Sequence, residues 1–350
     1  MERKRVGLVG VTGYTGMELC RLILHHPGME LVAATSRAEA GKRLGDLYPY
    51  LYGTAMADIE VQSPDYAALA AACDVVFLAV PHGTAMHAAR ELVAAGCRVV
   101  DLSADFRLRD VDTYRSWYAT EHACPELVPE AVYGLPELYG QAVARARLVA
   151  NPGCYPTASI LALYPAVAAG LVEPEDLIID AKSGASGAGR KANVATLFCE
   201  VHDSFRAYNL GRHRHTPEIE QELSRAAGKG ITVSFNPHLV PMDRGILATC
   251  YGRLRPHVDE ARVREVYAAF ASGKPWVRFL PPGVLPETRW VRGTNFCDIA
   301  VVVDERTRRL IVVSCIDNLC RGASGQALVN ANVMLGFPED AGLSRAPLVP

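Results

Sequence analysis

Hydrophobic residues in the first 150 positions fall into short, continuous apolar runs, separated by stretches with helical spacing. The runs that predict strands lie at 5–10, 30–35, 74–80, 98–103 and 147–150. Residues 17–26 and 84–96 predict helices between them. Strands that are apolar throughout are typical of a parallel sheet covered by helices on both faces. This half of the sequence therefore predicts a doubly wound α/β domain of the Rossmann type.

The pattern changes after about residue 150, where apolar strands are joined by longer connections and helical spacing becomes less frequent. The predicted strands lie at 177–182, 230–235, 245–252, 297–304 and 309–317. The predicted helices lie at 157–170, 217–228 and 259–272, with a last one at 322–337. Runs of strands with helices to one side predict an α+β domain with a mixed or antiparallel sheet.

Length, composition and net charge limit the classes of protein to which this chain can belong. The chain has 350 residues, 50% of them hydrophobic, and a net charge of −2. This length predicts two domains, and the charge gives no general footprint for nucleic acid or an anionic membrane. No apolar run reaches the ~18 residues of a membrane span, and the first residues lead directly into a predicted strand rather than a signal peptide. We therefore expect a cytoplasmic protein with neither nucleic-acid nor membrane partners.

Glycines recur in "GLVGVTGYTG" (7–16), at the turn between the first predicted strand and the first predicted helix. Gly10, Gly13 and Gly16 let the backbone turn sharply and approach a pyrophosphate at the helix N-terminus. The spacing departs from G-x-G-x-x-G by one residue, and a tight turn without a ligand is the alternative. Its position at the head of an alternating α/β domain favours a dinucleotide site.

The end of the second predicted strand bears on which dinucleotide binds. NAD sites usually carry Asp or Glu there, whereas this chain has Thr35, Ser36 and Arg37, with Lys42 and Arg43 nearby. A hydroxyl and a guanidinium suit a 2′-phosphate. The pattern therefore favours NADP(H) over NAD(H). The alternative for Arg37 is that it is a solvated surface residue with no ligand.

Ten cysteines are scattered singly, most of them inside apolar segments. They form no CxxC pair and no recognisable zinc spacing, so we predict no metal site and expect most to be small buried residues. Cys154 differs, because it stands in "NPGCYPTASI" (151–160), between a Pro-Gly turn and a helix predicted to begin around Thr157. A thiol near a helix start is favoured as thiolate, and the same N–H groups could hold an oxyanion. An inert cysteine in a turn is the alternative.

A thiol nucleophile needs a proton shuttle, and "GRHRHTPEIEQEL" (211–223) offers His213 and His215 just before a predicted helix. Either could instead be a surface or capping residue. The Gly/Ser loop "KSGASGAGRKAN" (182–193) ends in Arg190 and Lys191 and suits a phosphate or carboxylate, or is a flexible surface loop. An activated cysteine beside a nicotinamide is typical of aldehyde dehydrogenases and acyl-phosphate reductases.

The chain resembles the N-acetyl-gamma-glutamyl-phosphate reductase family of arginine biosynthesis, which is related to aspartate-semialdehyde dehydrogenase. "VANPGCYPTASILALYP" (149–165) is similar to the active-site signature of that family, and "KSGASGAGR" (182–190) makes the resemblance specific. Further similar blocks follow in the same order along the chain: "GVTGYTG" (10–16), "AVPHG" (79–83), "DLSADFRL" (101–108), "YGLPEL" (133–138), "HRHTPEI" (213–219), "PHLVPMDRGI" (237–246) and "DNLCRGASGQALVNANVMLG" (317–336).

The resemblance implies that NADPH reduces the 5-acyl phosphate of N-acetylglutamate to the semialdehyde with release of phosphate. It implies Cys154 as the nucleophile and His215 as the acid/base. The implied cofactor-binding residues are Gly10, Thr12, Gly13, Tyr14, Thr15, Gly16, Ser36, Arg37, Ser183, Gly184 and Asn318. Gly187 and Arg190 are implied between substrate and cofactor. Arg107, Arg190 and Arg244 are candidates to hold the phosphate and the α-carboxylate.

Family relatives return the C-terminal helix to the first domain, which implies domains of 1–150 with 318–350 and of 151–317. Relatives are commonly homotetramers or homodimers, and the apolar strands of the second domain could supply the interface. Three alternatives stay open. They are a lysine-biosynthesis reductase acting on a longer aminoadipyl phosphate, an aspartate-semialdehyde dehydrogenase, and a non-catalytic NADP-binding regulator.

Overall fold

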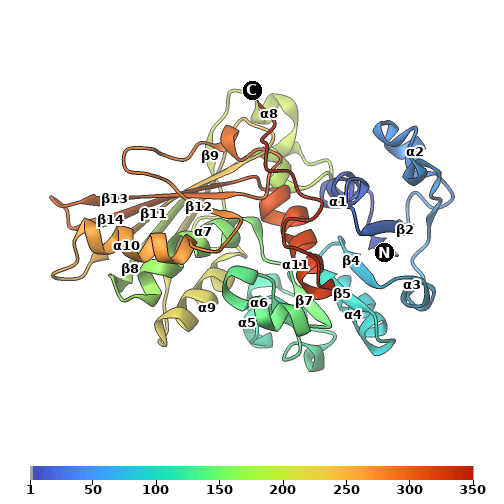
Figure 1. Cartoon of the computed structure of the whole chain (residues 1–350), viewed down its shortest axis with the longest axis horizontal. Helices are drawn as coiled ribbons and strands as arrows, with labels where there is room; N and C mark the ends of the chain where they lie inside the picture. The colour runs from blue at the N-terminus through green and yellow to red at the C-terminus, as the bar shows by residue number, and fades with distance from the viewer. Residues whose placement is uncertain (1–2, 350) are drawn as a thin grey trace. The chain divides into compact units, whose positions relative to one another are not determined.

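The computed structural model describes residues 3–349, which divide into two compact units (Figure 1). The first unit comprises residues 3–152 and 323–343, and the second comprises 153–322 and 344–349. We expected all of 318–350 in the first domain. Residues 318–322 and 344–349 instead group with the second unit. The last of them are held there because the Leu348 N–H donates to the Arg292 carbonyl over 2.9 Å. The Leu348 side chain also packs against Gly293.

The first unit is built on a seven-stranded sheet in the order β3-β2-β1-β4-β5-β7-β6, and the described strand pairs are parallel. Its strands are β1 (Lys4–Val9), β2 (Met29–Thr35), β3 (Val61–Gln62), β4 (Val75–Leu78), β5 (Arg98–Asp101), β6 (Val132–Tyr133) and β7 (Leu148–Ala150). The chain begins in the middle of this sheet and builds outward in both directions. This order confirms the predicted doubly wound fold.

Helices of the first unit follow the strands in alternation. They are α1 (Tyr14–Leu24), α2 (Leu44–Leu47), α3 (Tyr66–Ala72), α4 (Ala85–Ala94), α5 (Val111–Tyr118), α6 (Pro136–Arg145) and α11 (Gly325–Leu335). Helix α11 packs against α1 and α6, and α3 packs against α4. The C-terminal helix therefore completes the helical cover of a sheet made by the first 150 residues. None of the helices in residues 3–349 is long and apolar enough to cross a bilayer.

The second unit contains a mixed seven-stranded sheet in the order β12-β13-β14-β11-β8-β10-β9. Its strands are β8 (Val172–Ser183), β9 (Arg206–Ala207), β10 (Val233–Leu239), β11 (Ile246–Leu254), β12 (Val277–Phe279), β13 (Cys297–Asp304) and β14 (Arg309–Ile316). β8 pairs in parallel with β10 and antiparallel with β11. The predicted α+β domain with a mixed sheet is therefore confirmed.

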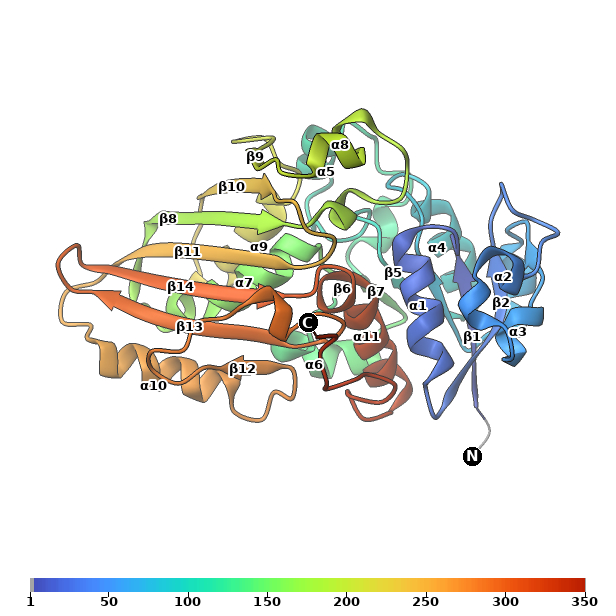
Figure 2. The same cartoon turned by 90° about the horizontal axis from the view of Figure 1, so that it is seen from above.

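The two faces of this sheet have different environments. The helices of the second unit are α7 (Cys154–Ala168), α8 (Phe198–Val201), α9 (Thr216–Ala227) and α10 (Glu260–Ala271). Figures 1 and 2 show α7, α9 and α10 on one face, where Ile179 and Ala181 are buried. Figure 2 looks onto the other face, where Ile178 and Asp180 are half exposed. Within the described part of the second unit no helix covers this open face, and its strands alternate between buried and half-exposed residues.

Candidate functional site

The predicted dinucleotide loop connects β1 to α1 in the first unit. Gly10 has a φ of 92°, and a Cβ on it would lie 2.4 Å from the Ala79 carbonyl oxygen. A Cβ on Gly16 would lie 2.5 Å from the Gly10 carbonyl oxygen. Only glycine fits these two positions, because the turn folds tightly back on the sheet and on itself.

The start of α1 has the form of an anion site. Gly13 is the N-cap residue, and the atom nearest to a Cβ placed on it would be the Thr15 Oγ1 at 3.8 Å. The Met17 N–H donates to the Gly13 carbonyl over 2.9 Å, so the N–H groups of Tyr14, Thr15 and Gly16 precede the internal hydrogen bonds of the helix. These donors and the space beside Gly13 fit the diphosphate of NADP(H).

Side chains distant in sequence hold the carbonyl groups of this loop. The Tyr48 hydroxyl, which is buried, donates to the Val11 carbonyl over 2.9 Å. The Ser324 hydroxyl donates to the Thr15 carbonyl over 2.8 Å. Sequence reasoning missed both residues. The only signal for Tyr48 is its place in the tyrosine-rich segment "YPYLY" (48–52), which does not reveal its target.

The end of β2 lies beside the loop, as predicted for the 2′-phosphate region. The Thr35 carbonyl accepts the N–H groups of Gly10 over 3.0 Å and Val11 over 3.1 Å. Ser36 follows and is buried, and Arg37 is exposed. The turn and the two residues predicted to bind the 2′-phosphate are therefore adjacent within the first unit.

The basic residues after β2 differ in how their charge is balanced. Lys42 Nζ lies 2.6 Å from Glu39, and an Arg43 guanidinium nitrogen lies 3.2 Å from Asp46. Arg37 forms no ion pair with any of residues 3–349. Of the three cations, Arg37 therefore has the charge best suited to an added phosphate.

Arg107 lies in the turn after β5 with its side chain buried. Its Nε donates to the Asn151 carbonyl over 2.7 Å, and its Nη2 donates to the Leu102 carbonyl over 2.9 Å. The guanidinium is thus fixed between two backbone segments of the first unit. Its role as a substrate ligand stays a prediction.

Two buried carboxyl groups organise the same turn and were missed as a pair from sequence. Asp101 accepts hydrogen bonds from the Ser103 N–H and hydroxyl, and burial, with the nearby Asp105 charge second, raises its pKa to about 7. Asp105 accepts the Gly83 N–H over 2.8 Å and the Tyr114 hydroxyl over 2.7 Å. These bonds join the "AVPHG" and "DLSADFRL" segments.

Cys154 is the first residue of α7 in the second unit, with Gly153 as the N-cap. We predicted a helix start around Thr157, which is wrong by three residues. Pro156 does not prevent the earlier start, because the first-turn N–H groups of a helix have no internal partner. Cys154 is partly exposed, whereas eight of the other cysteines are buried and Cys199 is exposed. Burial raises the pKa of Cys20 to about 12, as expected for an inert thiol.

The residues on both sides of Cys154 contact the start of α9. The Gly153 N–H donates to the Glu218 carboxylate over 2.8 Å. The Tyr155 ring lies edge-on to the His215 ring with 6.0 Å between centroids. The structure therefore brings the predicted nucleophile and the predicted acid/base to the same pair of helix N-termini.

The two candidate histidines have different environments. His213 packs edge-on against Tyr155 and Phe235, and its Nδ1 accepts the His215 N–H over 3.1 Å. Burial, with the Arg214 charge second, lowers the pKa of His213 from 6.5 to about 4. His213 is therefore a neutral ring within an aromatic cluster near neutral pH. His215 is the N-cap of α9.

The Gly/Ser loop follows β8 and is held by Asn318. The Gly245 N–H donates to the Asn318 amide oxygen over 2.7 Å, and the Asn318 amide nitrogen donates to the Ser186 hydroxyl over 2.9 Å. Ser183 at the end of β8 is buried, and Arg190 at the far end of the loop is exposed. Gly184 and Gly187 lie between them, joined by a Gly187 N–H to Gly184 carbonyl bond of 3.2 Å. The cofactor contact expected of Asn318 stays a prediction.

Arg244 is paired with a buried carboxylate. Its Nη2 donates to Asp317 Oδ1 over 3.0 Å, and its Nε lies 3.0 Å from Asp317 Oδ2. Asp317 also accepts the Gly293 N–H over 2.6 Å. This pairing balances the Arg244 charge and fixes the chain at the end of β14. The structure therefore supports a structural role for Arg244 more strongly than the predicted role in anion binding.

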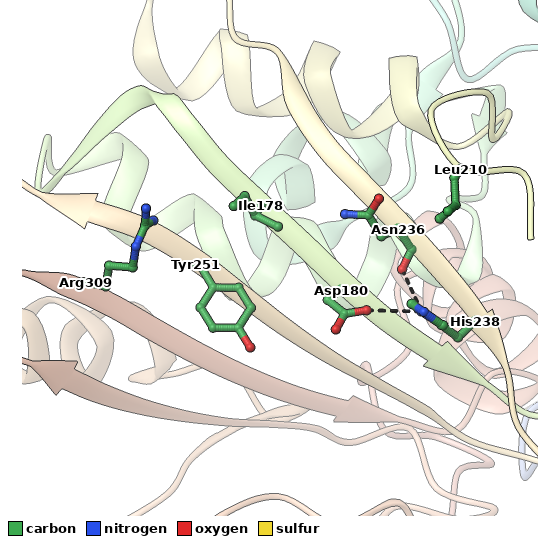
Figure 3. Close-up of a pocket in the computed structure, with 7 residues that line it drawn as sticks. All are labelled: Ile178, Asp180, Leu210, Asn236, His238, Tyr251 and Arg309. Carbon is green, nitrogen blue, oxygen red and sulfur yellow. Dashed lines mark hydrogen bonds and ion pairs between the residues drawn. The ribbon is translucent and has the colours of Figure 1, made fainter. Parts of the chain in front are cut away.

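A hollow of about 600 Å³ lies on the open face of the second sheet (Figure 3). Asp180 in it lies 3.1 Å from the His238 Nδ1 and 2.7 Å from the Lys182 Nζ. The described residues that line it are Ile178, Asp180, Leu210, Asn236, His238, Tyr251 and Arg309. None of these is a predicted site residue, and the lining connects to the Cys154 region through the Tyr155 hydroxyl, which donates to the His238 carbonyl over 3.1 Å.

Both parts of the chain match models of semialdehyde dehydrogenases. Residues 5–146 match the semialdehyde dehydrogenase NAD binding domain, and residues 154–318 match the semialdehyde dehydrogenase dimerisation domain. The N-acetyl-gamma-glutamyl-phosphate reductase of Desulforudis audaxviator is 53% identical over 346 residues, which cover 99% of each chain. That of Pelotomaculum thermopropionicum is 50% identical over 347 residues, again 99% of each chain.

Solved structures share the fold at low sequence identity. The crystal structure of aspartate semialdehyde dehydrogenase with NADP from Candida albicans matches with a TM-score of 0.70. The match covers 95% of this chain and 99% of that chain at 19% identity. The likeness therefore supports the arrangement of each unit's elements.

Proposed function

Because this chain belongs to the N-acetyl-gamma-glutamyl-phosphate reductase family of semialdehyde dehydrogenases, we propose that it reduces N-acetyl-L-glutamyl 5-phosphate. The products are N-acetyl-L-glutamate 5-semialdehyde and phosphate, and the cofactor is NADPH. The observation that carries the proposal is the identity of about half the residues along 99% of both chains. The placement of Cys154 at a helix start beside the His215 segment supports the chemistry.

The Cys154 thiolate attacks the acyl carbon and displaces phosphate to form a thioester. Cys154 opens α7, so the positive end of the helix favours the thiolate. The first-turn N–H groups of α7 are donors for the oxyanion that attack creates. Phosphate is a good leaving group, so this step places little demand on a general acid.

Proton supply matters most when the thioester is reduced to a thiohemiacetal. NADPH, when bound, supplies the hydride. His215 then provides the proton that neutralises the new oxyanion. The same proton returns to His215 as the thiohemiacetal collapses, which releases the aldehyde and the thiolate. The low pKa of His213 supports assigning this role to His215.

The cofactor would be held by the glycine loop and the end of β2. Thr12 and Gly13 lie where the chain turns into α1, and the N–H groups that begin this helix would bind the diphosphate. Ser36 and Arg37 would hold the 2′-phosphate, which favours NADPH over NADH. Arg107, Arg190 and Arg244 are the candidates for the substrate phosphate and α-carboxylate.

The open face of the second sheet is the proposed self-association surface. It carries half-exposed apolar side chains, including Ile178, Leu247 and Ile311. The hollow beside Tyr251 gives this face relief into which a second copy could fit (Figure 3). We propose a homodimer through this face, with a homotetramer as the larger assembly.

The activity is tested in the oxidative direction with NADP⁺, phosphate and N-acetylglutamate semialdehyde. Aspartate semialdehyde and N-acetyl-aminoadipate semialdehyde serve as competing substrates. Equal or better turnover of either competitor would contradict the proposed substrate. Cys154→Ser should abolish turnover and keep NADPH binding, and substantial residual activity would exclude the thioester route. A wild-type chain that binds NADPH and turns over none of the three would instead support a binding regulator.

A further inference from the structure

The Asp180 carboxylate, on the open face of the second sheet, lies beside two basic side chains. One of its oxygens lies 2.7 Å from the Lys182 Nζ, and the other lies 3.1 Å from the His238 Nδ1 (Figure 3). Lys182 and His238 occupy paired positions on the parallel strands β8 and β10. The carboxylate therefore balances one positive charge while the His238 ring is neutral and faces two when the ring is protonated.

The surroundings of the His238 ring determine where a second proton is added. Nδ1 lies 3.1 Å from Asp180 Oδ1 and 3.2 Å from the Asn236 carbonyl, so the neutral ring carries its hydrogen on Nδ1. Protonation therefore adds a hydrogen at Nε2, the nitrogen that is not beside Asp180. The side chain is 22% exposed and lines the hollow, so protons from solvent reach it.

The other elements beside His238 supply no second carboxylate. On β9, Arg206 pairs with the residue after His238, and Phe205 packs against the His238 ring with 5.4 Å between centroids. From α7, the Tyr155 hydroxyl reaches the His238 carbonyl rather than the ring. Among residues 3–349, Asp180 is the only acid within ion-pair distance of His238.

Positive charge already exceeds negative charge around the hollow. Arg253 and Arg309 share the single carboxylate of Asp176, at 3.5 Å and 3.2 Å. Together with the neighbouring carboxylate–ammonium pair of β8, they give three cations and two carboxylates while His238 is neutral. In a symmetric pair each copy presents the same patch to the other, so the excess is doubled. Protonated His238 adds one further cation per copy, and charges covered by an interface repel strongly and lose their hydration.

We propose that the charge of His238 controls self-association through the open face, so that two copies join while the ring is neutral and separate when it is protonated. This inference rests on the proposed homodimer and is independent of the reduction reaction. The occupant is a second copy, because residues 154–318 match a dimerisation domain. Ile178 lies between Asp176 and Asp180 on the same face of β8, so an interface that covers this apolar side chain also covers both carboxylates and their cations.

Sedimentation equilibrium of the full-length protein, at one ionic strength, measures the Kd of the dimer. Histidine side chains ordinarily change charge between about pH 5 and 8, so the measurement compares about pH 7.5 with about pH 5.5. The Kd should rise at least about tenfold at the lower pH, because each copy takes up a proton on dissociation. His238→Gln cannot gain this charge and should keep its Kd within about threefold across the same range.

His257→Asn is the matched control. His257 is an exposed histidine in the loop after β11 with a φ of 66°, a conformation that asparagine tolerates. This variant should keep the wild-type dependence on pH. A wild-type Kd that does not change with pH would overturn the inference, as would His238→Gln with the full wild-type dependence.

Ile178→Asp tests the face itself and should abolish the dimer at about pH 7.5, since it places a carboxylate in the covered apolar surface. A dimer that survives Ile178→Asp would overturn both the proposed face and its control by His238. Wild-type protein that stays monomeric at both pH values would contradict the proposed homodimer. A dimer that is lost in Ile178→Asp but is insensitive to pH would overturn the role of His238 alone.

Discussion

Gly322 and Cys154 are in direct contact within the second unit. A Cβ placed on Gly322 would lie 2.7 Å from the Cys154 Cβ and 3.1 Å from its Cα. These atoms belong to the backbone and the first side-chain carbon, so neither can rotate away. The segment before α11 therefore limits the position of Cys154 through a contact distinct from the Gly153–Glu218 bond.

Gly322→Ala should displace Cys154 and lower kcat about 10- to 100-fold. The added methyl group should also reduce the free energy of unfolding by about 1–3 kcal/mol, because it overpacks a closed contact. Steady-state kinetics and urea unfolding measure the two effects. Gly230→Ala is the control in the same unit, since no atom lies within 4 Å of a Cβ at that position. Wild-type kcat in Gly322→Ala would show that the contact does not constrain the thiol.

Arg37→Asp should change cofactor preference. The Arg37 charge is unpaired within residues 3–349, so replacing it with a carboxylate exchanges attraction for repulsion at the 2′-phosphate. We expect the Kd for NADPH to rise about 10- to 100-fold and the Kd for NADH to change little. Fluorescence titration with both nucleotides measures this. Lys42→Ala, which removes a cation already paired with Glu39, should leave both affinities near wild type. Equal losses for the two nucleotides in Arg37→Asp would remove the 2′-phosphate assignment.

Tyr48→Phe should weaken cofactor binding indirectly, because Tyr48 supports the glycine loop and is not itself a predicted cofactor ligand. The Tyr48 hydroxyl is the donor to the Val11 carbonyl in the glycine loop, and its loss leaves that carbonyl less constrained. We expect the Kd for NADPH to rise about 3- to 10-fold, which corresponds to about 0.5–1.5 kcal/mol for one hydrogen bond. Isothermal titration measures it. Tyr52→Phe is the control, because its hydroxyl bonds to the exposed Asp46 instead. An unchanged Kd in Tyr48→Phe would mean that the loop keeps its shape unaided.

The first unit followed closely from sequence because its signals are local. A few neighbouring residues are enough to recognise a strand or a turn of this kind. This applies to the apolar runs of β1, β2, β4, β5 and β7 and to the glycines of the first turn. Short elements such as β3 and β6, with two residues each, carry too little pattern to be recognised. They form because neighbouring strands supply their partners.

The contacts that shape the site are long-range, and sequence patterns do not report them. Glu218 lies 65 positions from Gly153, and Tyr48 lies 37 positions from Val11. In the sequence, Glu218 resembles any acidic residue in the first turn of a helix. No neighbouring residue indicates that its carboxylate accepts a backbone N–H from another helix. The start of α7 at Cys154 was also hidden, because Pro-Gly and Pro156 read locally as a turn. Residue chemistry could identify Cys154, but only packing shows what holds it.

His213 should make the stability of the protein depend on pH below neutrality. Its folded-state pKa of about 4 lies below the ordinary value of 6.5, so between these values the unfolded chain binds a proton that the folded chain does not. The free energy of unfolding should therefore fall as the pH drops from 6.5 to 4. At pH 4 the unfavourable protonation of His213 should have lowered it by about 3 kcal/mol. Above 6.5 the ring is neutral in both states and contributes no slope.

The comparison of His213→Gln with wild type isolates this contribution. Glutamine offers an oxygen acceptor for the His215 N–H and does not titrate, so the variant should lose stability less steeply than wild type between pH 6.5 and 4. Urea unfolding across that range measures the difference in slope, which is independent of any packing lost at pH 7. His202→Gln is the control, since His202 is an exposed residue at the end of α8 and its removal should leave the slope unchanged. Parallel curves for His213→Gln and wild type would show that the His213 ring accepts its proton in the folded protein as readily as in the unfolded chain.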